Sequence, residues 1–378
     1  MERAQTNTEE DSLHASHSDM KAMILAAGVG TRLDPLTLQL PKPLVPVANV
    51  PVMQHILRLL SDHGFKSGCA NLHYLPNMIV DYFQKNKEID IDIKYLVEEK
   101  LSGDAGGVRA CSNILQDDTF LVIMGDLLTN ADLSYLIAQH KAKGALATIG
   151  LKAVQDVSQL GVAIVDENGW IKEFQEKPAP GEERSNLAST GIYILEPAIF
   201  DFIPKSGGYG FGKQLFPSLV SKNLPILGVE IDCYWSDVGT LEQYRQANFD
   251  ALAGKIDINI LAKLNQNLGQ NIWAGENAQV ESSCVIEGKM LIGNNSVVSQ
   301  GANISGHVII GDNCSIESGA LIKDSIIWSG SRIGQKAKII NSVLGLNSHI
   351  EANKVLSDAT FVMPTEPKSK NVCQPLYT

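Results

Sequence analysis

The sequence lacks any long run of apolar residues, which excludes a membrane-spanning helix, since such a helix needs about 18 of them in succession. Its first twenty residues are polar and acidic, without the apolar stretch of a secretory signal peptide. We therefore expect residues 1–19 to form a disordered tail and the protein to be cytoplasmic.

Basic residues and cysteines are also scarce. Lysine and arginine total 31 against 42 aspartate and glutamate residues, giving a formal net charge of −11. Such a chain is poorly suited to nucleic acid or anionic membranes, because both require a basic surface. The six cysteines form no CxxC pair and no zinc-ligand spacing with histidine, so we expect reduced thiols.

The remaining sequence divides into two parts, as expected for a chain of 378 residues. Residues 20–255 alternate short β-branched runs with amphipathic helical patterns, which predicts an α/β domain with a mostly parallel sheet. A hairpin is predicted over residues 161–177. The other predicted strands are AMILA, CANLHYL, IDIKYLV, TFLVIMG and ALATIGL, and helices are predicted after Pro51, around Val80, Val108 and Leu136, and from Thr240.

Residues 268–362 follow a different repeat, in which a large apolar residue recurs about every six positions. A six-residue period predicts a parallel β-helix with an inward column of side chains, whereas sandwich strands would show a period of two. Residues 363–378 form a second predicted tail. The expected column is Ile286, Ile292, Val298, Ile304, Ile310, Ile316, Ile322, Trp328, Ile333 and Ile339.

The segment Leu25–Asn49, directly after the first predicted strand, contains residues suited to binding phosphate. Gly28 and Gly30 let the backbone approach a ligand, and backbone N–H groups there can hold phosphate oxygens. Arg32 and Lys42 add two cations, the second held between two prolines. The dinucleotide fingerprint is excluded because its third glycine is missing, and the P-loop because no Gly-Lys-Ser/Thr triplet occurs.

The string GVGTRLDPLTLQLPKPLVPV resembles the signature of the nucleoside-diphosphate-sugar pyrophosphorylases, or sugar-phosphate nucleotidyltransferases, which include mannose-1-phosphate guanylyltransferase. The resemblance covers Lys21–Gly254. It implies a Rossmann-like domain with a mixed, mostly parallel sheet, followed by a left-handed parallel β-helix. It also implies Mg²⁺-dependent transfer of a nucleoside monophosphate from a triphosphate to a sugar 1-phosphate, with release of pyrophosphate.

The same resemblance gives roles to individual residues. Arg32 and Lys42 would be catalytic, and Asp126 and Asp237 would bind Mg²⁺, for which two carboxylates are suitable ligands. The implied nucleotide-binding residues are Leu25, Ala27, Gly28, Gly30, Thr31, Glu98 and Gly103. The implied sugar-phosphate-binding residues are Gly161, Glu176, Lys177, Thr190 and Tyr193.

Substrate choice depends on a few residues around this predicted pocket. Glu98 could accept hydrogen bonds from two donors of guanine, so GTP with mannose 1-phosphate is the first expectation. Glucose 1-phosphate with UTP, dTTP or ATP is the next. Asp104, Ser189 and Gly210 stand where the family usually has Thr, Asn and Asp, and these departures indicate altered substrate choice.

Two alternatives remain open from the sequence. A regulatory relative would bind a nucleotide sugar without turning it over, and the three departures motivate this possibility. A β-helix acyltransferase would need a catalytic histidine, for which His307 and His349 are the candidates in that part of the chain. We otherwise expect the β-helix to mediate assembly into a homo-oligomer.

Overall fold

The structure is a computed structural model, and the predicted tails lie outside the part it describes except for Asp19 and Met363. It describes residues 19–256, 258, 263–264 and 271–363. The helices in these ranges lack the combined length and hydrophobicity that crossing a membrane requires. The chain forms two compact units, Met1–Arg32 with Pro41–Asn259, and Leu33–Leu40 with Ile260–Thr378.

The first unit is built on a nine-stranded sheet, and the sequence predicted its mixed character but not the strands β11 and β12. Seven strands follow the order β10-β9-β11-β6-β1-β4-β5, while β8 pairs with β11 and with β12. Strand β1 runs parallel to both β4 and β6, whereas β11 is antiparallel to its neighbours. The strands are β1 (Lys21–Leu25), β4 (Ser67–Leu72), β5 (Asp92–Val97), β6 (Phe120–Met124), β8 (Ala147–Ala153), β9 (Gly161–Val165), β10 (Ile171–Glu176), β11 (Leu187–Leu195) and β12 (Ile226–Glu230).

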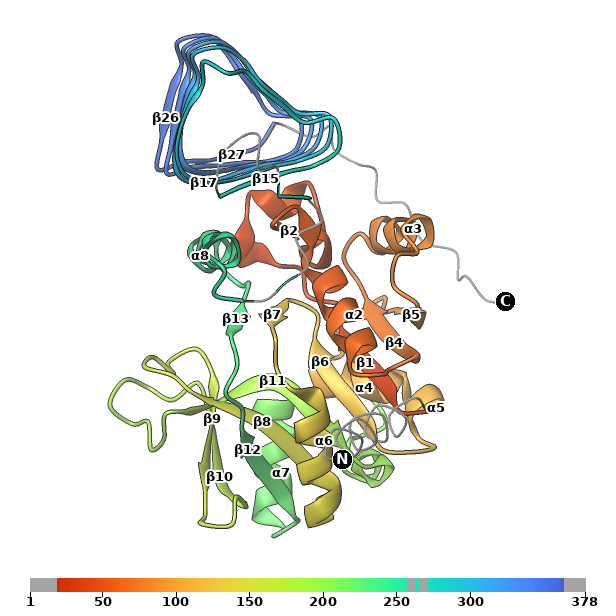
Figure 1. Ribbon diagram of the computed structural model, residues 1–378. Coiled ribbons are helices and arrows are strands. Elements are labelled where there is room, and N and C mark those ends of the chain that lie inside the picture. The colour runs from red at the N-terminus through yellow and green to blue at the C-terminus, as the bar shows by residue number, and fades with distance from the viewer. Residues whose placement is uncertain (1–18, 257, 259–262, 265–270, 364–378) are drawn as a thin grey trace, which may run out of the picture. The chain divides into compact units, whose positions relative to one another are not determined.

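Helices lie along this sheet (Figure 1), and each predicted helix is present. The last helix begins and ends at residues that favour helix ends. At its start the Thr240 side chain accepts a hydrogen bond from the Gln243 N–H, and at its end Gly254 adopts the left-handed conformation. The helices are α2 (Val52–Asp62), α3 (Pro76–Lys85), α4 (Asp104–Ala110), α5 (Ser112–Leu115), α6 (Leu133–Lys143), α7 (Phe216–Ser221) and α8 (Leu241–Ala253).

Two short strand pairs complete the first unit. Strands β2 (Pro46–Val47) and β3 (Val50–Pro51) form a tight hairpin after the glycine-rich segment. Strands β7 (Leu127–Thr129) and β13 (Trp235–Asp237) pair in antiparallel register, with Asp237 opposite Leu127. This second pairing brings Asp237 next to Asp126, although the two lie far apart in the sequence.

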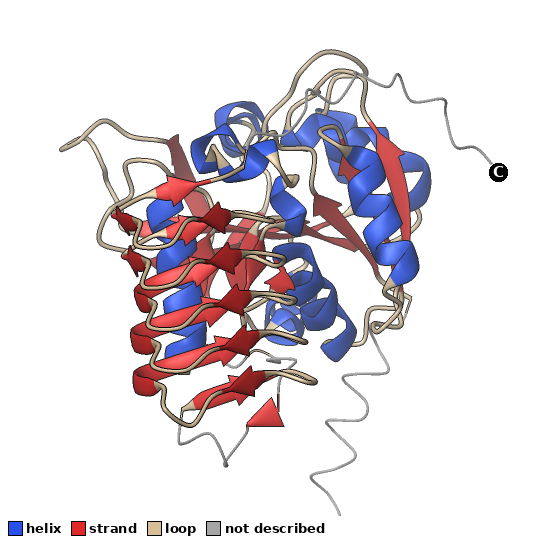
Figure 2. Ribbon diagram, turned by 90° about the horizontal axis from the view of Figure 1, so that it is seen from above, coloured by secondary structure: helices blue, strands red, loops and turns tan. Residues whose placement is uncertain are grey.

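The second unit is a left-handed parallel β-helix, which confirms the fold predicted from the six-residue period. Its coils form a triangle when viewed along their axis (Figure 1) and stack in parallel layers in the perpendicular view (Figure 2). Its strands are β14 (Lys263–Leu264), β15 (Ile272–Ala274), β16 (Gln279–Val280), β17 (Val285–Ile292), β18 (Val297–Val298), β19 (Asn303–Ile310), β20 (Ser315–Ile316), β21 (Leu321–Ile327), β22 (Arg332–Ile333), β23 (Lys338–Ile340), β24 (Val343–Leu344), β25 (His349–Ile350), β26 (Val355–Ser357) and β27 (Thr360–Phe361).

One position of the predicted column is wrong. Ile327, not Trp328, pairs with Ile310 and belongs to the apolar core of the β-helix. The coil from Ile310 to Ile327 is one residue shorter than the preceding coil, which runs from Ile292 to Ile310. The Trp328 side chain is still buried, but it does not belong to the inward column.

Candidate active site

A cavity of about 290 Å³ lies in the first unit at the carboxyl ends of β1, β4 and β6. Ligands commonly bind at this edge of a parallel sheet, where the loops that follow neighbouring strands meet. Of the predicted site residues, the cavity brings together Leu25, Ala27, Gly28, Lys42, Glu98, Gly103 and Asp126. Its other lining residues are Ala26, Pro43, Asn71, Leu101, Asp104, Met124 and Gly125.

Gly28 leaves room for a ligand at the floor of this cavity. A Cβ atom added there would meet no protein atom within 4 Å, so packing within the protein does not require a glycine. Gly30 has a φ of 77°, a conformation that glycine adopts without strain. Thr31 and Arg32 follow in a short 3-10 turn, Thr31–Leu33. The free space beside Gly28 suits close approach of the backbone to a phosphate.

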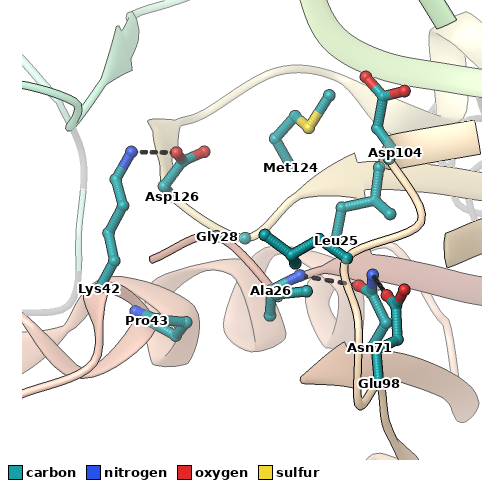
Figure 3. A pocket seen from close by; sticks show the side chains of 14 residues that line it. Leu25, Ala26, Gly28, Lys42, Pro43, Asn71, Glu98, Asp104, Met124 and Asp126 are labelled. Atoms are coloured by element: carbon teal, nitrogen blue, oxygen red, sulfur yellow. Dashed lines mark hydrogen bonds and ion pairs between the residues drawn. The ribbon is translucent and has the colours of Figure 1, made fainter. Parts of the chain in front are cut away.

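Four charged side chains from distant parts of the sequence meet beside the cavity. The Lys42 ammonium forms an ion pair with Asp126 (Figure 3) and lies 3.5 Å from Oδ1 of Asp237. Arg32 Nη2 lies 3.8 Å from Oδ2 of Asp237. The Val238 N–H donates to the Asp126 carbonyl, and this bond holds the two carboxylate-bearing segments together. The predicted catalytic and metal-binding residues therefore form one cluster.

The chemistry of this cluster fits a magnesium ion. Burial raises the pKa of Asp237, and the Asp126 charge adds to this, while Lys42 and Arg32 oppose it. In the described ranges no three His, Cys, Asp or Glu side chains converge on one point, so the cluster offers two carboxylates. Mg²⁺ characteristically takes one or two carboxylates and completes its shell with waters and substrate phosphates. Asp126 and Asp237 would hold the ion.

Both carboxylate oxygens of Glu98 accept hydrogen bonds from protein donors. Its Oε1 accepts a hydrogen bond from Asn71 Nδ2 at 2.6 Å, and its Oε2 accepts from both N–H and Oγ of Ser102. Asn71 in turn accepts from the Ala26 N–H at 3.0 Å (Figure 3). The Glu98 carboxylate thus fixes the loop that follows β5 instead of presenting two free oxygens to a base. This weakens the case for guanine that the sequence suggested.

Asn71 is a site residue that the sequence analysis missed. It is 3% exposed, lines the cavity and connects Ala26, the residue after β1, to Glu98 through its two side-chain hydrogen bonds. The available signal was an amide side chain inside the otherwise apolar strand that ends in CANL. A buried polar group of this kind requires partners, and here the partners are parts of the site.

Gly103 and Asp104 connect the cavity to the segment before α7. Gly103 has a φ of 78°, and a Cβ there would lie 2.5 Å from the Tyr209 carbonyl, so only glycine fits. Asp104 Oδ1 accepts from the backbone N–H of Phe211 at 2.6 Å, and it lies 3.4 Å from where a Cβ of Gly210 would be. Burial raises the pKa of Asp104, and the hydrogen bonds from the Phe211 and Ala105 N–H groups oppose this.

The predicted sugar-phosphate residues lie outside the cavity lining, although the charge of Asp104 acts on Glu176 and Tyr193. Glu176 is packed against Gly212, where an added Cβ would lie 2.0 Å from its Oε2, and against Gly161 at 3.0 Å. Burial raises the pKa of Glu176, Lys177 and Lys213 oppose this, and Asp104 adds to it. Two carboxylates and two ammonium groups therefore influence one another here.

The other two predicted sugar residues are largely committed to the fold. The Thr190 hydroxyl donates to the Gly150 carbonyl at 2.8 Å, so its side chain is bound within the sheet. Tyr193 packs against Phe211 and Phe216, and its hydroxyl lies 3.2 Å from Ser189 Oγ. Burial raises the pKa of the Tyr193 phenol. Direct contact of Thr190 and Tyr193 with a sugar stays a prediction.

The two histidines considered for an acyltransferase both lie on β-helix strands. His307 is in β19, and its backbone N–H donates to Asp324 Oδ1 at 3.0 Å. His349 is exposed in β25. Neither arrangement provides an independent indication of acyl transfer.

Comparison with known proteins agrees with this geometry. The nucleotidyl transferase family matches residues 21–254, a range that contains the whole charged cluster. The chain belongs to the nucleotidyl transferase family. Residues 269–365 of this nucleotidyltransferase match a second family, the LbH domain of the EIF2B epsilon subunit. The predictions of the enzyme family and of its β-helix partner are thereby confirmed.

Two curated relatives and one solved structure show the range of the family. A UTP–glucose-1-phosphate uridylyltransferase of Synechocystis sp. is 38% identical over 339 residues, covering 86% of this chain and 87% of the relative. A mannose-1-phosphate guanyltransferase of Schizosaccharomyces pombe is 34% identical, covering 70% of this chain and 74% of the relative. A putative glucose-1-phosphate thymidylyltransferase of Bacillus anthracis matches with a TM-score of 0.56 and 27% identity, covering 64% of this chain and 97% of that one.

Proposed function

We propose that this nucleotidyltransferase transfers a nucleoside monophosphate from a triphosphate to a sugar 1-phosphate and releases pyrophosphate. The observation that carries the proposal is the convergence of Lys42 and Arg32 with Asp126 and Asp237 beside the cavity that Gly28 lines. Two cations and two metal-ligating carboxylates next to a glycine-rich turn are suited to a polyphosphate. The family names of the relatives support the same reaction.

The reaction follows from the charges that this cluster provides. An oxygen of the sugar 1-phosphate attacks the α-phosphorus of the triphosphate in line, and the bond from that phosphorus to the β-phosphate oxygen breaks as pyrophosphate leaves. The attacking oxygen is already ionised at neutral pH, so the mechanism needs no general base. Lys42 and Arg32 stabilise the negative charge on the α-phosphate and on the departing pyrophosphate.

Asp126 and Asp237 would hold Mg²⁺, which when bound neutralises phosphate charge and orients the two substrates. The first contribution of the chain is to bring the two carboxylates together through the pairing of β7 with β13. Its second is to place both cations beside them, at the two ends of the segment from Arg32 to Lys42.

We propose UTP and glucose 1-phosphate as the substrate pair. The case for guanine rested on two free Glu98 oxygens, and these oxygens accept hydrogen bonds from Asn71 and Ser102. The relative that is 38% identical is named for UTP and glucose 1-phosphate. GTP with mannose 1-phosphate, the first expectation from the sequence, is the second candidate because the Schizosaccharomyces pombe relative is named for it.

A pyrophosphate-release assay with Mg²⁺, each triphosphate and a panel of sugar 1-phosphates tests these proposals together. Pyrophosphate with UTP and glucose 1-phosphate alone supports the first pair. Release only with GTP and mannose 1-phosphate replaces it with the second. No release with any combination, in protein that binds a nucleotide sugar, favours the regulatory alternative.

Assembly and location complete the proposal. We propose a homo-oligomer that associates through the β-helix, since stacked coils expose repetitive surfaces that can pair. We propose a cytoplasmic location because the substrates are highly charged metabolites that do not cross membranes unaided. Sedimentation of the whole chain and of surface variants of the β-helix would test the assembly.

A further inference from the structure

The β-helix unit includes a segment from the glycine-rich signature. Residues Leu33–Leu40 belong with Ile260–Thr378, although the chain on both sides of this segment belongs to the first unit. Within the second unit, the Gln39 amide forms a two-point contact with one β-helix residue. Its Nε2 donates to the Leu346 carbonyl at 3.1 Å, and its Oε1 accepts from the Leu346 N–H at 2.7 Å. A side-chain amide thus pairs with a peptide group as another strand would.

The Gln39 contact is closely packed. Gln39 is 7% exposed, and a Cβ added to Gly345 would lie 2.3 Å from its Oε1. In the same segment Leu33 and Leu36 are fully buried, while Leu38 is exposed. The two hydrogen bonds of Gln39 therefore hold the segment to the β-helix at Leu346.

The ends of this segment are the residues assigned to phosphate chemistry. Arg32 immediately precedes Leu33, and Lys42 lies two residues after Leu40. Both contact Asp237 in the first unit. The peptide chain thus runs from one catalytic cation to the β-helix and back to the other. Any shift of the held segment is transmitted along a few backbone bonds to both cations.

We infer that Gln39 is a positioning residue through which the β-helix sets the placement of Arg32 and Lys42. The inference rests on the proposed function. It gives the β-helix a part in the turnover of each subunit, separate from any part in assembly. Because misplacement of a transition-state group by about 1 Å can lower a rate as much as 100-fold, a small displacement here would be measurable.

The test compares Gln39→Met with Leu38→Ala in the full-length chain. Methionine keeps the length of the side chain and removes both hydrogen bonds, while Leu38 is an exposed neighbour in the same segment and serves as the control. We expect Gln39→Met to lower kcat about tenfold, with the KM for the sugar 1-phosphate changed less than threefold. Leu38→Ala should match the wild type in both parameters.

Gly345→Ala approaches the same contact from the β-helix. Its added methyl group would lie 2.3 Å from Gln39 Oε1 and 2.8 Å from Val362 Cγ1, so it would displace the Gln39 carboxamide and should lower kcat as Gln39→Met does. Since both changes break one contact, the double variant should lose little more than either single variant. Thermal unfolding, measured in parallel, separates lost activity from lost fold, and activity is expressed per folded protein.

The outcomes are distinct. An active wild type with a lowered kcat in both variants, non-additive in the double variant, supports the inference. An active wild type with normal kcat per folded molecule in both variants overturns it and leaves Gln39 a purely structural residue. A wild type that releases no pyrophosphate overturns the proposed function itself.

Discussion

The Lys42 ammonium forms an ion pair with the Asp126 carboxylate and also lies 3.5 Å from Oδ1 of Asp237. Both carboxylates are the proposed magnesium ligands, so the lysine and the metal ion compete for the same oxygens. A bound triphosphate offers the ammonium other negative oxygens, and the competition then ends. The geometry therefore favours metal binding together with nucleotide over metal binding alone.

Replacing Lys42 with methionine should reveal this competition directly. We expect Mn²⁺, a spectroscopic substitute for Mg²⁺, to bind the nucleotide-free Lys42→Met variant about tenfold more tightly than the wild type, because one positive charge is removed. Electron paramagnetic resonance of free Mn²⁺ measures this. The exposed Lys205 provides a control, and Lys205→Met should leave the affinity unchanged. Equal or weaker binding by Lys42→Met would contradict the competition.

The two aspartates should be indispensable for turnover. Asp126→Asn and Asp237→Asn each remove one carboxylate from the cluster, and we expect either to lower kcat by about 1,000-fold, while circular dichroism shows an intact fold. Asp232→Asn, at an exposed carboxylate near Asp237 in the sequence, should retain wild-type activity. Near-normal turnover by Asp237→Asn would remove this residue from the proposed site.

We expect Glu98 to contribute equally to the binding affinity of all four triphosphates. In Glu98→Gln the carboxylate that accepts from Asn71 and Ser102 becomes an amide, so the loop after β5 loses part of its support. We expect several-fold weaker binding of every triphosphate, with their order of preference unchanged. Competition binding with the four triphosphates measures this. A changed preference between GTP and UTP would mean that Glu98 reads the base.

We expect the carboxylate of Asp104 to compensate for the side chain that Gly210 lacks. Asp104 Oδ1 lies 3.4 Å from where a Cβ of residue 210 would be, so its carboxylate occupies space next to the missing side chain. We expect Asp104→Thr and Gly210→Asp each to lower kcat/KM for the sugar 1-phosphate about tenfold. The first replaces the charged acceptor of the Phe211 N–H with a neutral hydroxyl, and the second adds a like charge.

The double variant Asp104→Thr/Gly210→Asp should then recover most of that loss, because it restores one carboxylate to the pair. Steady-state kinetics of all four proteins form the cycle. Strictly additive losses would show that the two departures are independent. Recovery would mean that they preserve an electrostatic arrangement instead of changing the substrate.

Much of the fold could be predicted from sequence because its signals are local. Thr240 and Gly254 mark the ends of α8 through capping and a left-handed turn. The six-residue period identified the β-helix. The prediction that Trp328 lies in the column was wrong because one coil is a residue shorter, and the inward position moved to Ile327. A coil that is one residue shorter shifts the phase of the six-residue repeat but leaves its residue types unchanged, so the repeat alone does not reveal the shift.

The site was less predictable where it depends on long-range contacts. Arg32 and Lys42 could be predicted because a glycine-rich segment followed by two cations suits phosphate, and Asp126 and Asp237 could be predicted from the family resemblance. The hydrogen bonds from Asn71 and Ser102 to Glu98 could not be predicted, since they require the loop after β5 to lie beside β4. The attachment of Gln39 to Leu346 joins residues at opposite ends of the chain, and no sequence period links them.

The reverse reaction shows whether the chain is a sugar-1-phosphate nucleotidyltransferase. Purified protein is incubated with UDP-glucose, pyrophosphate and Mg²⁺, and the formation of UTP is followed, with GDP-mannose and Asp237→Asn in parallel. We expect UTP from the wild type, at least 100-fold less from Asp237→Asn, and no dependence on any further reactant. If folded wild-type protein binds either nucleotide sugar but forms no triphosphate, the chain is not a sugar-1-phosphate nucleotidyltransferase and the regulatory alternative takes its place.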